Sequence, residues 1–304
     1  MAQSSFVKEI EKYFDDVKGK KSEELLFSYK GVLYPVGLCS AETFQALDII
    51  EFRQDDVLLA SYPKCGSNWT QHILNDFINA LPNNKEVSQL ERFHVLEFEM
   101  SEKFQKIKNA PSPRMFCTHL HYDDIPKAVF ENKVKVLLVL RNPKDAAVSY
   151  YHFYNKNPGL PNVSSWDEFF QKFMSGEVTW GSYFDHALSW NKHMAEENIM
   201  IITYEEMKEN LPRGVKQIAE FLGFSLPEEK IRSIAENATF QSMSNKSQET
   251  HGRFAPMLFR KGDVGDWKNL FTETQSQEMD AKFEECLAGT KLEAKLKYDK
   301  YCKY

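Results

Sequence analysis

The sequence predicts an α/β fold: one domain over residues 1–304, with a central, mostly parallel β-sheet flanked by helices and a helical C-terminal half. Two observations lead to this prediction. Short runs rich in Val, Ile, Leu and Phe occur four times, and helical patterns separate them. Near-continuous apolarity, rather than alternation, is typical of strands covered on both faces of a parallel sheet. The four expected strands are residues 56–62, 114–120, 133–140 and 198–204.

The segment after the first expected strand has the period of a helix. Apolar residues recur there every four positions and form one stripe, made by Trp69, Ile73, Phe77 and Leu81. We expect Ser67 or Asn68 to cap the first turn, because short polar side chains accept hydrogen bonds from the free N–H groups of a helix start.

Further helix signals follow along the chain. Ser165 and Glu168 have the spacing of a capping box, and residues 213–222 end on Gly223, a typical C-terminal stop. From about Glu205 onward the sequence shows no further strand. Residues 1–30 are charged and amphipathic at their start, and we expect a helical lead-in to the domain there.

Composition restricts the possible partners and compartment. The chain carries 38 basic and 44 acidic side chains, a net charge of −6, which argues against nucleic acid or an anionic membrane as a partner. No segment is apolar enough to serve as a signal peptide or to span a membrane. Five widely spaced cysteines fit neither a disulfide framework nor a zinc site, so we expect a cytosolic protein with reduced thiols.

Residues 60–69 form a loop between the first expected strand and the helix. Lys64, Gly66, Ser67 and Asn68 suit an anion there, because a helix N-terminus adds unpaired N–H groups and the positive end of its dipole. The lysine precedes the glycine, so the loop is not a Walker motif. The local pattern leaves two interpretations open, a phosphate site and ordinary turn chemistry.

Four ordered segments decide between them by resemblance: residues 62–69, 118–120, 141–149 and 260–268. Together they resemble the cytosolic sulfotransferases, and the resemblance extends from Tyr34 to about Cys302 and is greatest to the 6B subfamily. It implies that the loop binds phosphosulfate in a P-loop-like manner. It also implies transfer of a sulfonate group from 3′-phosphoadenylyl sulfate (PAPS) to the hydroxyl of a small acceptor, such as a phenol, iodothyronine or steroid, in xenobiotic and hormone metabolism.

The resemblance also implies roles for individual residues. His119 would be the general base, a task that suits imidazole because it titrates near neutral pH. Lys64 would stabilise charge on the oxygen between sulfur and the 5′-phosphate, and we predict no metal. The implied donor-binding residues are Lys64, Cys65, Gly66, Ser67, Asn68 and Trp69 in the loop, Arg141, Ser149, Arg260, Lys261 and Gly262 at the 3′-phosphate, Trp69, Tyr204 and Phe240 around the adenine, and Ala238, Thr239, Met243, Leu258 and Phe259 in the matching segments.

The sequence departs from the family at three places. Cys117 stands where many relatives carry a lysine, which leaves open a catalytically weak relative that binds a nucleotide or a hydrophobic ligand. Cys65 replaces a common serine, and a lowered thiol pKa would make it sensitive to oxidation. In the segment that resembles the family's dimer motif, Glu273 and Gln277 break the pattern, so a homodimer is possible but its motif is altered. A nucleotide kinase is the third interpretation, which the lack of Walker spacing disfavours.

Overall fold

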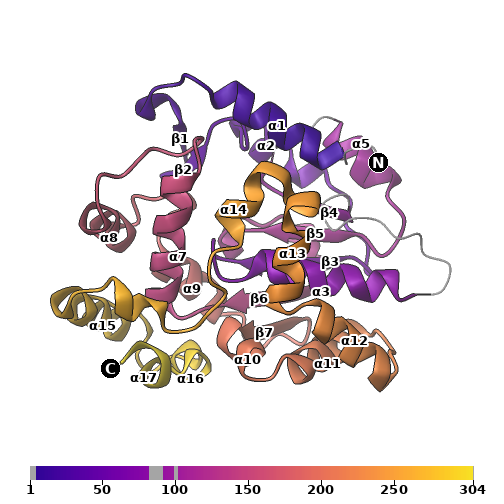
Figure 1. The fold of residues 1–304 in the computed structure, drawn as a ribbon. Coiled ribbons are helices and arrows are strands. Elements are labelled where there is room, and N and C mark those ends of the chain that lie inside the picture. The colour runs from indigo at the N-terminus through magenta and orange to yellow at the C-terminus, as the bar shows by residue number, and fades with distance from the viewer. Residues whose placement is uncertain (1–4, 82–91, 99–101, 304) are drawn as a thin grey trace.

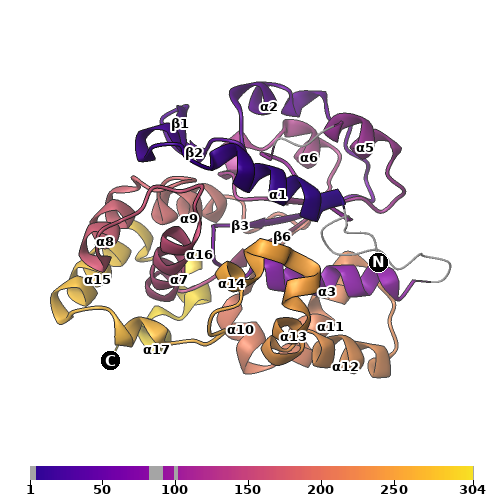
Figure 2. The ribbon, with the colours of Figure 1, turned by 45° about the horizontal axis from the view of Figure 1, so that its top comes forward.

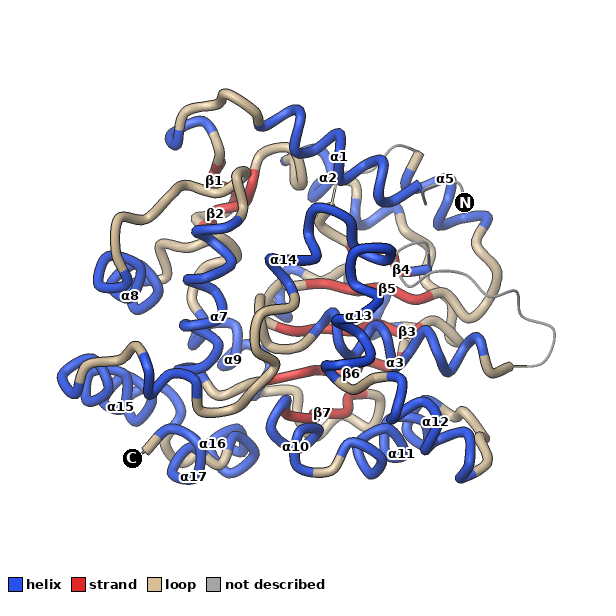
Figure 3. Tube along the Cα trace, viewed as in Figure 1, coloured by secondary structure: helices blue, strands red, loops and turns tan. Residues whose placement is uncertain are grey.

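The computed structural model describes residues 5–81, 92–98 and 102–303, and its centre is a parallel sheet (Figure 1). The strand order is β4-β5-β3-β6-β7, and every neighbouring pair is parallel. Figure 3 shows these strands side by side, with helices around them. The strands are β3 (Val57–Ser61), β4 (Phe93–Val95), β5 (Met115–Thr118), β6 (Lys135–Leu140) and β7 (Ile199–Thr203).

The four strands expected from apolar runs are all present, and the predicted α/β class is confirmed. Prediction missed β4, which has only three residues, and a two-stranded antiparallel hairpin, β1 (Leu26–Tyr29) with β2 (Val32–Pro35). Lys30 and Gly31 both take positive φ in its turn, so the Lys-Gly pair was the available signal.

Two apolar layers enclose the sheet because successive strand side chains point to opposite faces. Leu58 and Ala60 of β3 pack in the cluster that includes the helices after β6 and the C-terminal helices. Val57 and Leu59 pack in the second cluster, with the helix after β3 and those after β7. Burial on both faces explains why these strands are apolar at every position.

Helices make up most of the remaining chain, and in the described residues after β7 no strand occurs. No helix of the described residues is both long and apolar enough to cross a bilayer. The helices are α1 (Ser5–Val17), α2 (Ala41–Gln45), α3 (Ser67–Asn79), α5 (Lys103–Asn109), α6 (Lys127–Glu131), α7 (Pro143–Lys156), α8 (Trp166–Ser175), α9 (Tyr183–Asn191), α10 (Tyr204–Glu209), α11 (Leu211–Leu222), α12 (Glu228–Asn237), α13 (Phe240–His251), α14 (Ala255–Leu258), α15 (Glu273–Leu287), α16 (Lys291–Leu296) and α17 (Tyr298–Cys302). Short 3-10 turns are η1 (Ser22–Glu24), η2 (Leu47–Ile49), η3 (Tyr122–Asp124), η4 (Gly252–Phe254) and η5 (Asp266–Asn269).

Two of the three predicted helix ends are confirmed. Ser165 caps α8 by accepting a hydrogen bond from the backbone of Glu168, although the Glu168 carboxylate accepts from the backbone of Ser164 and so does not complete a capping box. Gly223 ends α11 in a left-handed conformation. The cap predicted for α3 is wrong: Gly66 is the N-cap, with φ +109°, and no side chain caps this helix. Its first N–H groups therefore have no side-chain cap to satisfy them.

A buried lysine joins α7 to the C-terminal helices. The Lys144 ammonium, fully buried, lies 2.6 Å from the Asp280 carboxylate and donates to the Ser276 hydroxyl at 2.7 Å and the Cys302 carbonyl at 2.6 Å. It also lies 4.4 Å from the centre of the Trp267 ring. A buried charge is tolerated only when it is paired and hydrogen-bonded, so these contacts fix the start of α7.

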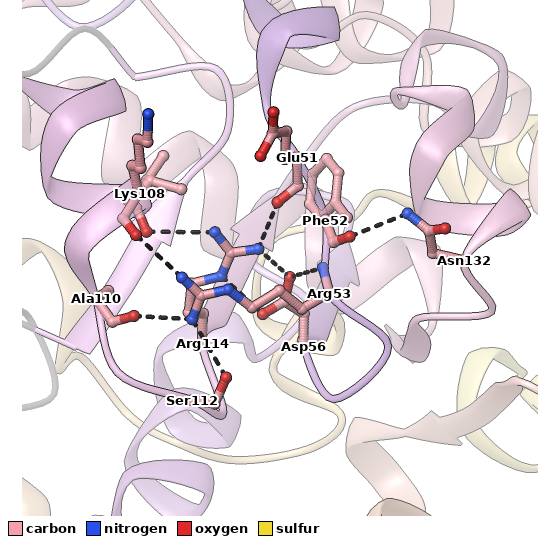
Figure 4. Close-up of polar contacts among 10 residues, drawn as sticks. Glu51, Phe52, Arg53, Asp56, Lys108, Ala110, Ser112, Arg114 and Asn132 are labelled. Carbon is pink, nitrogen blue, oxygen red and sulfur yellow. Dashed lines mark hydrogen bonds and ion pairs between the residues drawn. The ribbon is translucent and has the colours of Figure 1, made fainter.

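A second buried ion pair holds the amino-terminal edge of the sheet (Figure 4). Arg114, just before β5, donates from Nε to Asp56, just before β3, at 2.8 Å, and from Nη2 to the Glu51 carbonyl at 2.7 Å. Arg53 lies beside it and donates to the carbonyl oxygens of Lys108 and Ala110 at 3.0 and 2.9 Å. This cluster stabilises the loops at the edge opposite the strand ends discussed next.

Candidate active site

A cavity of about 270 Å³ opens at the carboxyl edge of the sheet, where open α/β sheets bind ligands. The predicted site residues come directly after strand ends. Lys64 follows β3, His119 follows β5, Arg141 follows β6 and Tyr204 follows β7, and all four line the cavity. Helices α13 and α14 close another side, with α13 beside α3 and α14 beside α7 in both Figure 1 and Figure 2.

The loop after β3 has an unusual backbone. Lys64 has φ +68° and Gly66 has φ +109°, so two of its residues take the left-handed region. A Cβ on Gly66 would lie 3.1 Å from the Tyr204 ring, so glycine suits this position for space as well as for conformation. The loop ends at the start of α3, where Ser67 and Asn68 line the cavity.

Lys64 is a basic side chain without an acidic partner among the described residues. Its ammonium lies 3.5 Å from the Met257 carbonyl and 4.4 Å from the centre of the Phe153 ring. Burial, followed by the nearby charges of Arg141 and Arg260, lowers the pKa of Lys64 to about 7. Burial and like charges both disfavour the charged form of Lys64. An anion bound in the cavity would lower the free energy of that charged form and so raise the pKa of Lys64.

Arg141 forms the next part of the basic wall. Its guanidinium donates to the carbonyls of Lys64 at 3.2 Å and Asp263 at 2.9 Å, and it stacks 4.3 Å from the centre of the Tyr204 ring. The Nε atom is buried with no hydrogen-bond partner among the described residues. A buried donor without an acceptor is rare, and it fits a ligand that supplies acceptor oxygens. Ser149, eight residues on, lines the same cavity.

The segment that carries Arg260, Lys261 and Gly262 closes the basic end. Arg260 and Lys261 both pair with the Asp266 carboxylate, the former at 2.6 Å. Gly262 has φ +71°, and a Cβ there would lie 2.3 Å from the Phe240 ring. Glycine at this position thus allows the backbone to pass directly over an aromatic ring at the cavity wall.

An aromatic group lies between the loop and the C-terminal segment. Trp69 packs edge to face with Tyr204 at 5.1 Å and donates from its indole to the Ala238 carbonyl at 2.7 Å. Trp69 also packs against the second apolar cluster, so it belongs to the core and the cavity wall at once. The other predicted residues in this wall are Phe240, Met243, Leu258 and Phe259.

His119 lies at the other end of the basic wall. Its Nδ1 is 2.7 Å from the Ser61 carbonyl, and since a carbonyl can only accept, Nδ1 carries the proton and Nε2 is the basic nitrogen of the neutral ring. Trp180 packs edge to face with the ring at 5.3 Å. Burial lowers the pKa of His119, opposed by the nearby Glu97 carboxylate. The geometry and the protonation state therefore suit a proton acceptor.

Three predicted residues do not line the cavity. Cys65 is fully buried, and burial raises the pKa of its thiol, so the expectation of a lowered pKa is wrong. Ala238 is also fully buried and contributes its carbonyl to Trp69. Thr239 caps α13 through the backbone of Ser242.

An apolar part of the cavity wall was not foreseen from the sequence. Its residues are apolar or aromatic and come from segments far apart: Leu38, Phe98, Phe153, Leu160, Trp180 and Phe254. In the aromatic stretch 150–154, Tyr150 and Tyr154 are buried and donate hydrogen bonds to Thr179. Tyr150 and Phe153 of this stretch both line the cavity.

His251 also escaped prediction. It ends α13, is 4% exposed, and its Nε2 lies 2.7 Å from the side-chain oxygen of Asn68. This bond joins α13 to the start of α3, and no sequence pattern indicated it.

Comparison with known proteins agrees with this arrangement. A family model described as the sulfotransferase domain matches residues 54–291. The chain belongs to the sulfotransferase family. It is 55% identical over 300 residues to Sulfotransferase 6B1 of Homo sapiens, covering 99% of this chain and 98% of that protein. It is 49% identical over 282 residues to Sulfotransferase 6B1 of Danio rerio, covering 93% and 95%.

A solved structure, mouse sulfotransferase SULT7A1 complexed with PAP, has a TM-score of 0.80 with 33% identity and covers 90% of this chain and 98% of that one. These comparisons confirm the predicted fold, the likeness to the 6B subfamily and the predicted class, a sulfotransferase that uses PAPS.

Proposed function

We propose that this protein transfers a sulfonate group from PAPS to the hydroxyl of a small aromatic or alicyclic acceptor such as a phenol, an iodothyronine or a steroid. One observation carries the proposal. Lys64 and His119 lie in one cavity whose wall is basic and aromatic on the side of Arg141 and apolar on the side of Trp180. The basic side suits an anionic nucleotide, and the apolar side suits a hydrophobic acceptor.

The residues present fit the donor. We assign the 3′-phosphate to Arg141, Ser149 and the segment 260–262, because Arg141 Nε is buried without a partner among the described residues and the wall there is basic. The phosphosulfate would lie against the backbone of residues 65–68 at the start of α3. The adenine would pack in the aromatic wall formed by Trp69, Tyr204, Phe240, Met243, Leu258 and Phe259. Ala238 is buried next to Trp69, and Thr239 is exposed at the start of α13.

When bound, PAPS supplies the sulfonate group and a bisphosphate leaving group. His119 Nε2 accepts the acceptor's proton, and the Ser61 carbonyl holds the ring in the tautomer that leaves Nε2 free for this. The Lys64 ammonium stabilises the negative charge that develops on the leaving oxygen. The proposal assigns no step to a metal ion.

Substitution of the two residues tests this assignment. We expect His119→Ala to abolish transfer and to leave the affinity for adenosine 3′,5′-bisphosphate nearly unchanged, whereas Lys64→Ala lowers both. Turnover at the wild-type rate in His119→Ala would exclude this base.

Thermal-shift titration tests which nucleotide the cavity binds. The bisphosphate at about 100 times its dissociation constant should add roughly 2.7 kcal/mol of stability, and ATP with magnesium or 5′-AMP should add less.

One observation favours a second candidate, a relative that binds the nucleotide with little turnover. Cys117 lines the cavity where many relatives carry a lysine, and its sulfur accepts a hydrogen bond from Gln71 at 3.0 Å. Tight bisphosphate binding without sulfonate transfer to any of a panel of phenols and steroids would favour this candidate. A gain of activity in Cys117→Lys would identify the missing charge as the cause.

We also propose a cytosolic location, a role in xenobiotic and hormone metabolism, and one domain over residues 1–304 with residues 1–30 as its lead-in. Residues 1–4, 82–91, 99–101 and 304 of that range lie outside the described residues. Glu273 and Gln277, which alter the dimer motif, are exposed at the start of α15. Light scattering would measure whether the protein forms a homodimer in solution.

A further inference from the structure

A buried carboxylate lies directly behind the proposed base. Glu97, in the segment after β4, is fully buried and accepts three hydrogen bonds. They come from the Thr118 hydroxyl at 2.9 Å, the backbone N–H of His119 at 2.8 Å and the Trp180 indole at 3.2 Å. Glu97 lies outside the four family segments of the sequence and does not line the cavity.

The backbone on both sides of Glu97 is held in turn by a buried lysine. Lys103, which begins α5 and is 6% exposed, donates to the carbonyl of Leu96 and, at 2.9 Å, to that of Phe98. Leu96 also donates its N–H to the Cys117 carbonyl at 2.9 Å, which joins this segment to β5. Strands β4 and β5 lie side by side in Figure 3. These bonds fix the position of the Glu97 carboxylate relative to the end of β5.

His119 is therefore connected to Glu97 in two ways. Its backbone donates to the carboxylate directly, and its ring packs against Trp180, whose indole binds the same carboxylate. Trp180 has φ +60°, a strained conformation for a bulky residue, which needs such contacts to persist. The ring itself is oriented by the Ser61 carbonyl.

We propose that Glu97 is a positioning residue for sulfonate transfer: its carboxylate orients His119 and Trp180 together at the cavity wall, and its negative charge favours the proton that His119 accepts. This inference rests on His119 as the base. A charge close to the imidazole in a buried site acts strongly because little solvent screens it.

The other charged and titratable groups around His119 act in the opposite direction. Burial is the largest influence and lowers the pKa of His119, Glu97 raises it, and Lys64 lowers it further. His186, fully buried on α9, interacts electrostatically with His119, and Lys103 interacts with Glu97. The Glu97 carboxylate thus opposes the effect of Lys64 on the pKa of His119.

Glu97→Gln tests the charge at nearly constant shape. We expect the acid limb of the pH profile of kcat/KM for the acceptor to move to lower pH, because the imidazole loses the charge that favours its proton. The plateau should fall on the order of tenfold or more, since a weaker base transfers the proton less well. Affinity for adenosine 3′,5′-bisphosphate should stay within about twofold of wild type. NMR titration of the His119 ring, assigned by its loss in His119→Ala, should show the same direction of change without any turnover.

Two further variants separate position from charge. Thr118→Val removes one donor and keeps the carboxylate, so the acid limb and the NMR titration of His119 should stay where they are in wild type. Glu97→Asp keeps the charge and withdraws the carboxylate, so kcat should fall while the titration stays close to wild type. Should Glu97→Gln not fold, Glu97→Asp still decides the positioning role, because wild-type kcat in that variant would contradict it.

The outcomes distinguish this inference from the proposed function. An unchanged NMR titration of His119 and an unmoved acid limb in folded Glu97→Gln overturn the role of Glu97, even if kcat falls. Wild-type turnover in His119→Ala overturns the base instead, and the NMR titration then still reports whether Glu97 acts on the ring. If Glu97→Gln only reduced the fraction of folded protein, kcat/KM would fall by the same factor at every pH and the acid limb would not move. That result would also count against the inference.

Discussion

The basic wall of the cavity predicts that binding of adenosine 3′,5′-bisphosphate is coupled to uptake of a proton by Lys64. In the protein without ligand, burial and neighbouring cations lower the pKa of Lys64 from its usual 10.5 to about 7. The amine is therefore mainly neutral at pH 8. A phosphate in the cavity favours the ammonium, so the pKa of Lys64 rises on binding and a proton is taken from solution.

The size of the effect follows from these two values. At pH 8 about 0.9 of the Lys64 side chains are neutral before binding, and at pH 6 about 0.1 are, by the ordinary titration relation. If binding restores the usual pKa, proton uptake is about 0.9 per ligand at pH 8 and about 0.1 at pH 6. Affinity from this group alone falls about tenfold between pH 6 and pH 8, because at the higher pH the proton must be acquired on binding.

Isothermal titration calorimetry in two buffers of different ionisation enthalpy measures the uptake directly. Lys64→Arg is the matched control, since guanidinium keeps its proton and the charge is retained. The phosphates of the ligand, with a second pKa near about 6, contribute equally to both proteins, so the difference between them isolates Lys64. Equal uptake at pH 8 in wild type and Lys64→Arg would refute the argument that the site holds a neutral amine awaiting an anion.

Three further outcomes follow from contacts described above. His251→Phe should weaken bisphosphate binding about tenfold in calorimetry, the worth of one hydrogen bond, and should have no further effect once Asn68→Ala is present. Gly262→Ala should lower the same affinity at least about tenfold, because its φ of +71° and the adjacent aromatic ring leave no place for a Cβ; unchanged binding would contradict this. Arg114→Leu should lower the free energy of unfolding in urea by about 3–5 kcal/mol by leaving a buried carboxylate unpaired, and adding Asp56→Leu should recover part of it.

The features that the sequence predicted are local ones. A buried parallel strand is apolar throughout, so β3, β5, β6 and β7 could be recognised from short runs. Since parallel strands end at one edge, a functional residue just after each of them predicted one site, and Lys64, His119, Arg141 and Tyr204 do line one cavity. The start of α3 was misassigned because Ser67 and Asn68 are good caps in general, whereas the left-handed backbone at Gly66 ends the loop one residue earlier.

The features that escaped prediction depend on contacts between distant segments. Leu38, Phe98, Leu160 and Phe254 have no shared pattern in the chain, and only the fold brings them to one wall. Strand β4 is too short for its period to be recognised. Glu97 illustrates the limit most clearly, because a lone acid among charged neighbours gives no sign that it will be fully buried behind a histidine.

The anchoring of Lys144 bears on how the chain is made. The Lys144 ammonium donates a hydrogen bond to the carbonyl of Cys302, a residue that is synthesised 158 positions later. While the nascent chain emerges, α7 and the strand end that carries Arg141 are already outside, but the charge beneath them has no partner to neutralise it. Long-range closure of this kind delays completion of the nucleotide site until the C-terminal helices arrive. A ribosome-stalled chain that ends before α15 should therefore not retain adenosine 3′,5′-bisphosphate.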